Sequence, residues 1–483
     1  MRNYSMLLQL LLVIVLTACY SSRRSKGGGQ TNVPAIRETS PADIVLPEGY
    51  TAEVVASGLN FPTAVCFNDE GVPYVIEAGY SYGEVFTVPR LLKIVNGETQ
   101  EVMKGNENGP WTGIAWHKGN FYIAEGGQKE GGKILKVTPE GKQTVLVDGL
   151  PGNGDHHLNG PVVMNDHIYF GTGSVTNSGV VGPDNADFGW LHRFPRLHDI
   201  PCQDITLAGV NYEAADALNK KGGAQTVTGA YLPFDSASTE GMVIKGKLPC
   251  SGAILRVPLQ GKELQLVAWG LRNPYGLAES PDGKLYVTEN GPDVRGSRPI
   301  WGTGDVLWEI NEGSWYGWPD FMEGKPVALF KRPGGAKPQK VLQTQPGEVP
   351  KPVATLAVHS SSNGIDFSTS ETFGWKGEAF IAQFGDMAPG VGKVLSPVGF
   401  RVVRVNVNSG SVEDFMSNRG KKTGPASWLG TKGLERPVSV QFDPSGKSLY
   451  VVDFGILQMT GDGQSKPVKN TGVLWKITKK SSL

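Results

Sequence analysis

Two adjacent histidines have the type and position needed for proton transfer. His156 and His157 occur in the run Gly-Asp-His-His-Leu-Asn-Gly, directly before a short apolar segment at residues 159–163. A neutral imidazole at the entrance of an inner strand can act as a general base. From these residues alone, two other interpretations are at least as well supported: a histidine on the surface, or a histidine that contacts a metal only incidentally.

An arginine and an asparagine occupy a similar position farther along the chain. Arg272 and Asn273 belong to the run Gly-Leu-Arg-Asn-Pro-Tyr-Gly at residues 270–276. A guanidinium beside a carboxamide is suited to hold a carboxylate or an oxyanion. The alternative is a structural arginine that bonds the carbonyl groups of loops.

Hard oxygen donors follow these two residues. They are Glu-Asn-Gly-Pro at 289–292, Asp305, and Gly-Ser-Trp-Tyr-Gly-Trp-Pro at 313–319. Backbone carbonyls and a carboxylate are ligands that suit Ca²⁺. The sequence therefore indicates a calcium site built from one part of the fold.

A repeated pattern supplies the elements that position these groups. Gly or Pro opens a short apolar alternation, a polar turn follows, and a second strand ends in a small or acidic residue. Six copies occur, at residues 62–79, 112–126, 159–173, 275–291, 363–382 and 436–453. A third apolar segment follows each copy, at residues 91–95, 133–137, 253–257, 306–310, 402–405 and 473–477.

This repetition predicts an all-β fold, a six-bladed β-propeller of four-stranded antiparallel blades. One blade cannot bury both faces of its sheet, so its neighbours must supply the packing. The spacing of the copies places loop insertions in blades three to five, around residues 175–250, 292–304 and 322–358. Long loops in a compact domain are usually functional. The propeller is predicted to span residues 44–480, and nothing in the sequence indicates a second domain.

The charge balance excludes one class of partner. The 483 residues carry 46 Lys and Arg against 46 Asp and Glu, so nucleic-acid binding has no electrostatic basis. The 65 glycines and 33 prolines, together with 39% hydrophobic residues, agree with many short strands joined by tight turns.

The first residues are expected to form a targeting segment. Arg2 precedes an apolar stretch at 7–16, and Leu-Thr-Ala-Cys ends at Cys19. This resembles a bacterial lipoprotein signal, in which residues 1–18 are removed and the cysteine is lipidated. An ordinary secretory signal with an incidental cysteine is the alternative. Residues 19–43 would then be a flexible tether to a membrane of the cell envelope, the outer membrane in a Gram-negative cell.

Three more cysteines occur after the tether. Cys66 lies in an apolar run and is expected to be buried in a strand. Cys202 and Cys250 both lie in the first long insertion. In an oxidising compartment they could form a disulfide that cross-links this insertion. Spacing alone does not show that the two meet, so the disulfide is one of two possibilities.

The order of the motifs resembles one enzyme family. His-x-x-Gly at 157–160, Arg-Asn-Pro-x-Gly-Leu at 272–277, Glu-x-Gly-Pro at 289–292 and Tyr-Gly-Trp-Pro at 316–319 are similar to motifs of the glucose/sorbosone dehydrogenase family. These proteins are soluble, six-bladed aldose dehydrogenases that depend on pyrroloquinoline quinone (PQQ). The resemblance covers about residues 44–480.

The resemblance implies a catalytic base. His157 matches the residue that takes the proton from the sugar C1 hydroxyl while hydride passes to the quinone, and His156 is the fallback if the register differs by one. The family usually continues His-x-Gly-Gly-Arg, whereas this chain has Pro161 where that arginine is expected.

The resemblance also implies cofactor contacts. Arg272 and Asn273 match residues that hold the quinone and stabilise its developing negative charge. Arg436 matches a contact to a cofactor carboxylate in the last blade, and Glu107 lies where the family often has a polar contact. A lysine that contacts the cofactor in the fifth blade is replaced here, near residues 383–385.

The implied calcium site uses residues of the fourth blade. Gly291, Pro292 and Tyr316 would each give a backbone carbonyl, and Asp305 a carboxylate, to a Ca²⁺ ion that polarises the quinone. The family's acidic pair is reduced here to Asp305-Val306.

We therefore expect a lipid-anchored, PQQ-dependent sugar dehydrogenase that oxidises a sugar or a related alcohol or aldehyde and passes electrons to an acceptor in the envelope. A propeller that binds a glycan or a protein without turnover is the alternative, because one fold serves many functions. A Ca²⁺-dependent lactonase on a similar propeller would need an axial cluster of carboxylates, and Asp155, Glu289 and Asp305 do not suffice to argue for one.

Overall fold

The computed structural model describes residues 33–34, 36–79, 87–219, 223–387, 397–459 and 465–480. The predicted signal segment 1–18 and the lipidation site Cys19 lie outside the described residues, as does most of the predicted tether. Among the described residues, no helix has both the length and the apolar character needed to cross a membrane.

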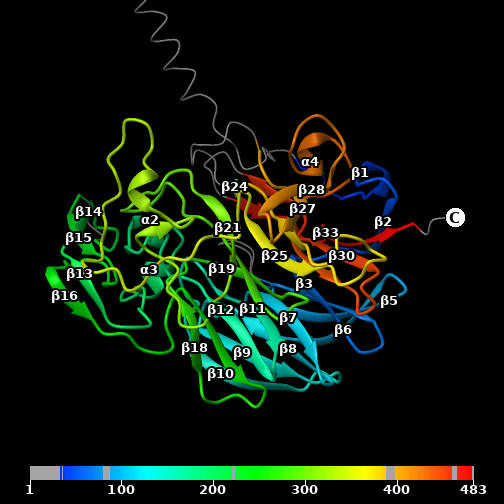
Figure 1. Cartoon of the computed structure of the whole chain (residues 1–483), viewed down its shortest axis with the longest axis horizontal. Coiled ribbons are helices and arrows are strands. Elements are labelled where there is room, and N and C mark those ends of the chain that lie inside the picture. Colours follow the sequence, from blue (N-terminus) through cyan, green and yellow to red (C-terminus); the bar gives the residue numbers. More distant parts are fainter. Residues whose placement is uncertain are drawn as a thin grey trace, which may run out of the picture.

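Six antiparallel sheets form the body of the molecule, five of four strands and one of five, and this confirms the predicted all-β, six-bladed propeller (Figure 1). In order from the inner to the outer strand, the first three blades are β3 (Pro62–Phe67), β4 (Pro73–Glu77), β5 (Arg90–Val95) and β6 (Glu98–Lys104); β7 (Trp111–His117), β8 (Asn120–Glu125), β9 (Gly132–Val137) and β10 (Gln143–Leu150); and β11 (Leu158–Met164), β12 (His167–Thr172), β17 (Ala253–Pro258) and β18 (Gln265–Trp269).

The second half of the ring repeats this arrangement. Its blades are β19 (Pro274–Glu279), β20 (Leu285–Glu289), β21 (Gly304–Glu309) and β24 (Ala354–Val358); β25 (Ser362–Phe367), β26 (Ala379–Gln383), β27 (Arg401–Asn406) and β28 (Ser411–Asn418); and β29 (Pro437–Phe442), β30 (Ser448–Asp453), β33 (Gly472–Lys479) and β2 (Tyr50–Leu59). The short strand β1 (Ile44–Val45) pairs with the edge of β28.

The inner strands surround a narrow channel. Each contacts the next around the ring, and β29 contacts β3 to complete the circle. All six line a cavity of about 60 Å³. Tyr275 on β19 lines this cavity and also packs against the hydrophobic cluster shared by the first and sixth blades. Its ring therefore reaches across the channel and narrows it.

Glycines in the inner strands allow this close approach. A Cβ atom on Gly113 would overlap the carbonyl of Gly160 in the next blade, and one on Gly276 would overlap the carbonyl of Asn363. A larger residue at either position would push two blades apart, which explains why Gly recurs near the start of the repeated unit.

A buried carboxylate ends the second strand in four of the six blades. Glu289 accepts hydrogen bonds from the backbone N–H of Arg272 at 2.5 Å and from Nε1 of Trp308 at 2.6 Å. The bonds tie the entrance of the inner strand to the second and third strands of the same blade. The other three carboxylates are Glu77, Glu125 and Asp453, all buried.

The outer strand of the sixth blade comes from the beginning of the domain. β2 pairs antiparallel with β33, with Tyr50 opposite Lys479 and Leu59 opposite Gly472. The two ends of the propeller are therefore joined in one sheet. The repeat pattern did not predict this, because β2 precedes the first copy of the repeat.

The first insertion, between β12 and β17, contains its own secondary structure. It comprises α2 (Pro183–Asp187), α3 (Trp190–Arg193), the paired strands β13 (Ile205–Ala208) and β16 (Glu240–Ile244), and the hairpin β14 (Asn211–Ala215) and β15 (Gln225–Gly229). In Figure 1 these elements gather on the side of the molecule opposite β2 and β33.

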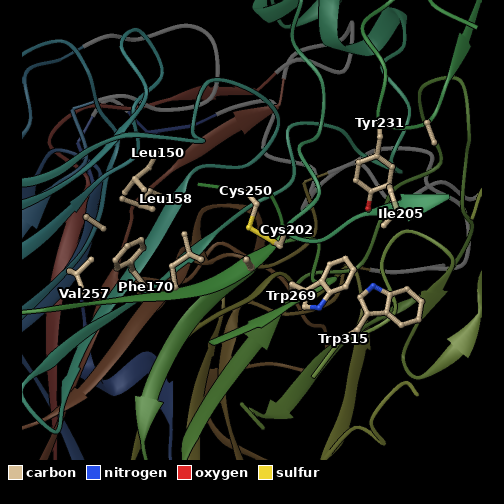
Figure 2. Packing of buried hydrophobic residues seen from close by; sticks show 14 of the residues in the cluster. Leu150, Leu158, Phe170, Cys202, Ile205, Tyr231, Cys250, Val257, Trp269 and Trp315 are labelled. Carbon is tan, nitrogen blue, oxygen red and sulfur yellow. A yellow bond between two sulfur atoms is a disulfide. The ribbon is translucent and has the colours of Figure 1, made fainter. Parts of the chain in front are cut away.

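A disulfide fastens this insertion to the third blade. Cys202 and Cys250 are bonded, so the expected pairing is present, and Figure 2 shows them among packed apolar side chains. The surrounding cluster joins Phe170 of β12 to Ile205 and Tyr231 of the insertion. Cys66 is buried in β3, as expected.

Smaller elements complete the structure. They are η1 (Pro41–Asp43), β22 (Phe321–Met322), β23 (Lys325–Pro326), η2 (Val327–Leu329), α4 (Ala426–Leu429), β31 (Leu457–Met459) and β32 (Ser465–Pro467). The loops that contain β22, β23 and η2 correspond to the predicted insertion around residues 322–358. Because β24 completes the fourth blade, this insertion belongs to the fourth blade and not to the fifth.

Candidate active site at the channel mouth

The residues that directly precede the inner strands gather at one end of the ring. Every blade repeats the same strand order, so the six inner strands run in the same direction and enter from the same end. His157 precedes β11, Arg272 and Asn273 precede β19, and Arg436 precedes β29. We call this end the channel mouth, and add to these four residues His359, which precedes β25.

The ring of His157 is held in one orientation. Its Nδ1 lies 2.8 Å from the carbonyl oxygen of Gly152, so Nδ1 carries the proton and donates it to that oxygen. Nε2 is then the basic nitrogen. The side chain is buried, and burial lowers its pKa, which leaves the imidazole neutral at pH 7. These are the properties of a general base.

His156 is also buried and neutral, but its surroundings differ. Its Nδ1 lies 2.7 Å from the carbonyl oxygen of Ser174, and its Nε2 lies 3.5 Å from a carboxylate oxygen of Asp155. Burial, helped by the charge of Arg272, lowers its pKa to about 3. Because a carboxylate faces its basic nitrogen, His156 is the poorer candidate for taking a proton from a hydroxyl.

Arg272 is fixed by carbonyl groups of two loops. Nε donates to the backbone oxygen of Asn177 at 2.8 Å, Nη2 to the Oδ1 of Asn177 at 2.9 Å, and Nη1 to the backbone oxygen of Asn290 at 3.0 Å. This is the structural role raised as an alternative above. Asn177 comes from the first insertion, and its Nδ2 donates to the backbone oxygen of Asp293 at 2.9 Å. Sequence reasoning missed Asn177, which carries no motif.

A chain of amides crosses three blades beside Arg272. Asn159 donates to Oδ1 of Asn273 at 3.1 Å, and Asn273 donates to Oδ1 of Asn290 at 3.0 Å. Asn290 in turn donates to the backbone oxygen of Ser362 at 2.8 Å. The third, fourth and fifth blades are thus joined at the mouth, and Asn273 lies in the middle of the chain.

Three carboxylates surround a second arginine that the sequence did not single out. Arg295 contacts Asp155 at 2.5 Å, Asp184 at 2.6 Å and Asp293 at 3.4 Å. Burial opposes the ionisation of Asp155, but the charges of Arg295 and Arg272 and the hydrogen bond from Arg295 outweigh it and lower the pKa of that carboxyl. The cluster fastens the first insertion to the loop after β20.

His359 lies at the entrance of the fifth blade. Its Nδ1 is 3.4 Å from a carboxylate oxygen of Asp293, and its side chain is 7% exposed. Burial opposes the charged form, yet the bond to Asp293 and the charge of that carboxylate raise the pKa of the imidazole. This residue was also missed, because an isolated histidine between two strands gives no signal in the sequence.

Arg436 is buried between two aromatic rings. Its guanidinium carbon lies 5.0 Å from the ring centre of Phe384 and 4.9 Å from that of Phe400, and Nη1 donates to the backbone oxygen of Gly385 at 3.1 Å. Burial lowers its pKa to about 10, so it is cationic at pH 7.

Glu107 does not join the buried groups. Its side chain is 65% exposed and pairs with Lys129, whereas the next residue, Asn108, is buried and donates to Glu125 at 2.8 Å. The implied cofactor contact at Glu107 is therefore not supported by its position.

Of the implied calcium ligands, Gly291 lies beside Asp305, whereas Tyr316 does not. Asp305 accepts hydrogen bonds from the N–H groups of Gly291 at 3.0 Å and Ser362 at 2.7 Å, and from Oγ of Ser360 at 3.0 Å. Its carboxylate joins the fourth and fifth blades. Among the described residues, no group of three His, Cys, Asp or Glu side chains could hold a metal ion.

Tyr316 lies in a different place from Asp305. Its hydroxyl donates to the backbone oxygen of Glu309 at 2.7 Å, and its ring packs against Trp308. Asp305 and Glu309 stand near opposite ends of β21, about 13 Å apart at the usual rise of a strand. The backbone N–H of Tyr316 donates to the carbonyl of Trp269 on the outer strand of the third blade. The backbone of Tyr316 thus lies against the third blade, whereas Asp305 bonds Ser360 and Ser362 at the fifth, so these positions do not support the expectation that both residues hold one ion.

Comparison with known proteins supports the family resemblance. Residues 245–388 match the glucose/sorbosone dehydrogenase family model. This segment contains Arg272, Asn273 and His359, whereas His157 and Arg436 lie outside it. No curated protein sequence matches the chain.

Solved structures share the fold at low sequence identity. The PQQ domain of a pyranose dehydrogenase from Coprinopsis cinerea, in its holo form, has a TM-score of 0.53 and 14% identity, covering 93% of this chain and 100% of that one. An enzyme of carbohydrate-active family AA12 from Trichoderma reesei gives 0.53 and 15%, with coverage of 93% and 100%. A glucose dehydrogenase gives 0.51 and 16%, with coverage of 88% and 99%. The predicted resemblance to the glucose/sorbosone dehydrogenase family is thus confirmed by the family match over residues 245–388, within a six-bladed propeller.

Proposed function

We propose that the protein is a PQQ-dependent oxidoreductase that oxidises a sugar or a related alcohol or aldehyde. The observation that carries the proposal is the buried, neutral His157, whose Nδ1 is fixed by Gly152 at the mouth of a propeller that matches the glucose/sorbosone dehydrogenase family. The fold neighbours include the PQQ domain of a pyranose dehydrogenase, which agrees with this chemistry.

The donors at the mouth fit an anionic quinone. PQQ carries three carboxylates, and the mouth offers the buried guanidinium groups of Arg272 and Arg436 together with the carboxamide of Asn273. Guanidinium groups and amide N–H groups bind carboxylates and quinone oxygens well in a buried setting. Arg272, Asn273 and Arg436 are the residues that would hold the cofactor.

The chain's own groups have distinct tasks in the oxidation. When bound, the quinone supplies the two-electron acceptor. Nε2 of His157 takes the proton from the substrate hydroxyl, because its neutral form persists at pH 7. Arg272 and Asn273 favour negative charge on oxygens next to them, and the loops that hold Arg272 keep it from turning away.

The residues do not fit a calcium ion in the way the resemblance implies. Both oxygens of Asp305 already accept hydrogen bonds from the chain, and the backbone of Tyr316 lies against the third blade, away from the fifth-blade partners of Asp305. No step of the oxidation is therefore assigned to calcium.

We also propose that the protein is anchored in the cell envelope. The basis is the sequence up to Cys19, which resembles a lipoprotein signal, and the disulfide between Cys202 and Cys250, which suits an oxidising compartment. Electrons would then pass to an acceptor in the envelope. Mass spectrometry of the mature N-terminus tests the anchor: a diacylated Cys19 supports it, and a chain that retains residues 1–18 contradicts it.

The test of the function is a titration of the purified protein with PQQ, followed by aldose-driven reduction of a dye. Binding, with turnover that His157→Gln reduces at least about 100-fold, would support the proposal. His192→Gln is the matched control, because His192 is exposed on α3. A folded protein that binds no PQQ at micromolar concentration would contradict the proposal and favour a propeller that binds a glycan or a protein without turnover.

A further inference from the structure

His359 is a buried histidine that the proposed mechanism does not use. It lies between β24 and β25, where Ser360 bonds Asp305 and accepts a hydrogen bond from Gln383 at 3.2 Å. These contacts place the imidazole at the junction of the fourth and fifth blades, at the channel mouth. His359 has a φ of 58°, a left-handed conformation that is uncommon for residues other than glycine.

Nδ1 of the imidazole has a clear partner, whereas Nε2 has none among the described residues. Nδ1 faces the carboxylate of Asp293 at 3.4 Å. Nε2 is buried and has no hydrogen-bond partner within the part of the chain that the structure describes. A buried polar atom without a partner destabilises the folded protein, which makes this nitrogen a candidate for binding a ligand.

The charge of the ring decides what Nε2 can bind. Beside Asp293, and within the field of Asp386 and Asp305, the pKa of His359 is raised although burial opposes it. The protonated ring has N–H groups on both nitrogens, so Nε2 is a charged donor. A charged donor prefers an anionic acceptor such as a carboxylate.

The neighbours of His359 belong to the site that the cofactor would occupy. Asp293 donates its backbone N–H to Oδ1 of Asn177 at 2.9 Å, and the same oxygen accepts from Arg272. Gly385 donates its backbone N–H to the carbonyl of Ser360, next to His359, and its own carbonyl accepts a hydrogen bond from Arg436.

We propose that His359 is a ligand-binding residue of the mouth and donates its Nε2–H to a carboxylate of the bound quinone. This proposal rests on the proposed PQQ-dependent function and deepens it. His359 thus supplies a cationic donor from the start of the fifth blade. Asp293 acts through His359 by orienting the ring and favouring its charge.

The test compares two ligands and two variants of the full-length protein. The ligands are PQQ and its trimethyl ester, which keeps the quinone but lacks the carboxylate charges. His359→Asn removes the charge and keeps a residue type that tolerates the left-handed backbone. His192→Asn is the matched control, because His192 is exposed on α3. Binding is measured by calorimetry, and folding by the thermal transition of each variant.

We expect His359→Asn to weaken PQQ binding about tenfold or more, to leave ester binding within about twofold of the unsubstituted protein, and to differ in both respects from the control. Equal PQQ binding by His359→Asn and the unsubstituted protein overturns the role of His359 alone. Failure of the folded, unsubstituted protein to bind PQQ overturns the proposed function, and this inference with it.

A second measurement does not depend on the stability of the variant. In ¹⁵N-histidine-labelled protein, the Nε2 resonance of His359 reports its proton and its partner. We expect the shift of a protonated ring and a change in that resonance when PQQ is added. A resonance that PQQ leaves unchanged while PQQ binds would contradict the proposal.

Discussion

His156 and His157 are adjacent in the chain, yet their rings differ in chemical use. Both have Nδ1 on a carbonyl oxygen, which leaves Nε2 as the basic nitrogen. Asp155 faces the Nε2 of His156 at 3.5 Å, so a substrate hydroxyl there could donate to the buried carboxylate instead of to Nε2. Asp155 therefore distinguishes the two histidines and leaves His157 as the better candidate for the general base.

The pH dependence of turnover tests the role of His157. A general base works in its deprotonated form, and burial lowers the pKa of His157 below the ordinary value of 6.5. We therefore expect kcat/KM to stay level as the pH falls through 6.5 and to decline only below it. An acid limb centred above pH 6.5 would contradict this assignment.

Asn177 is expected to be a positioning residue for Arg272. Its Oδ1 accepts hydrogen bonds from Arg272 and from the N–H of Asp293, both at 2.9 Å. Asn177→Ala leaves these buried donors without that acceptor, at a cost of about 1–3 kcal/mol in the free energy of unfolding. PQQ affinity should fall as well, while the exposed Asn408→Ala changes neither quantity. Unchanged PQQ affinity in a destabilised variant would limit Asn177 to a structural role.

Removal of divalent cations tests the correction at Asp305. The carboxylate is engaged by three donors of the chain, and burial raises its pKa, so it is a poor ligand for a hard cation. We expect EDTA to leave both the melting temperature and PQQ affinity unchanged. A loss of PQQ affinity that calcium restores would contradict the correction.

At the scale of elements, the insertion of the third blade contributes side chains to the candidate site. Asn177 and Asp184 reach from it to Arg272 and Arg295, so the site depends on where the insertion lies. Buried Arg298 strengthens the attachment, donating to the carbonyl of Ser178 at 2.9 Å and pairing with Asp320 at 2.8 Å.

The disulfide should stabilise this insertion. Cys202 and Cys250 are 48 residues apart in the sequence, and closing a loop of that length corresponds to about 4 kcal/mol in the chain-entropy model. We expect Cys202→Ala with Cys250→Ala to lower the free energy of unfolding by up to that amount and to make protease cleavage in the insertion faster. Cys66→Ala is the control, because Cys66 is buried but unpaired with another cysteine. If the double variant resisted protease as well as the unsubstituted protein does, the disulfide would not stabilise the insertion.

At the scale of the whole molecule, β2 closes the ring. It pairs with β33 along its length, so the first and last parts of the domain share the sixth blade. A ring whose last blade lacks an outer strand leaves an apolar edge and an open sheet.

Removing β2 should therefore destabilise all six blades together. A chain that begins at residue 60 is expected to lose cooperative thermal unfolding, whereas one that begins at residue 33 keeps it, because β2 begins at Tyr50. Calorimetry of the two chains makes the comparison. A cooperative transition at the same temperature in both would show that the ring closes without β2.

The sequence by itself determined the number of blades and the place of their inner strands. Strand alternation, turns and the acidic end of the second strand are local patterns, so they can be recognised one unit at a time. His157, Arg272, Asn273 and Arg436 could be placed at one end of the ring because each directly precedes such a strand.

Only the tertiary structure decided which side chains meet. Arg295 and Asp155 are separated by 140 residues, and no local pattern relates them. Asp305 looked like a metal ligand in the sequence, but backbone N–H groups of two blades satisfy it in the fold. Side-chain partners across blades depend on how loops of different length return to the mouth. That geometry arises when the ring closes, and it is not contained in any single repeat.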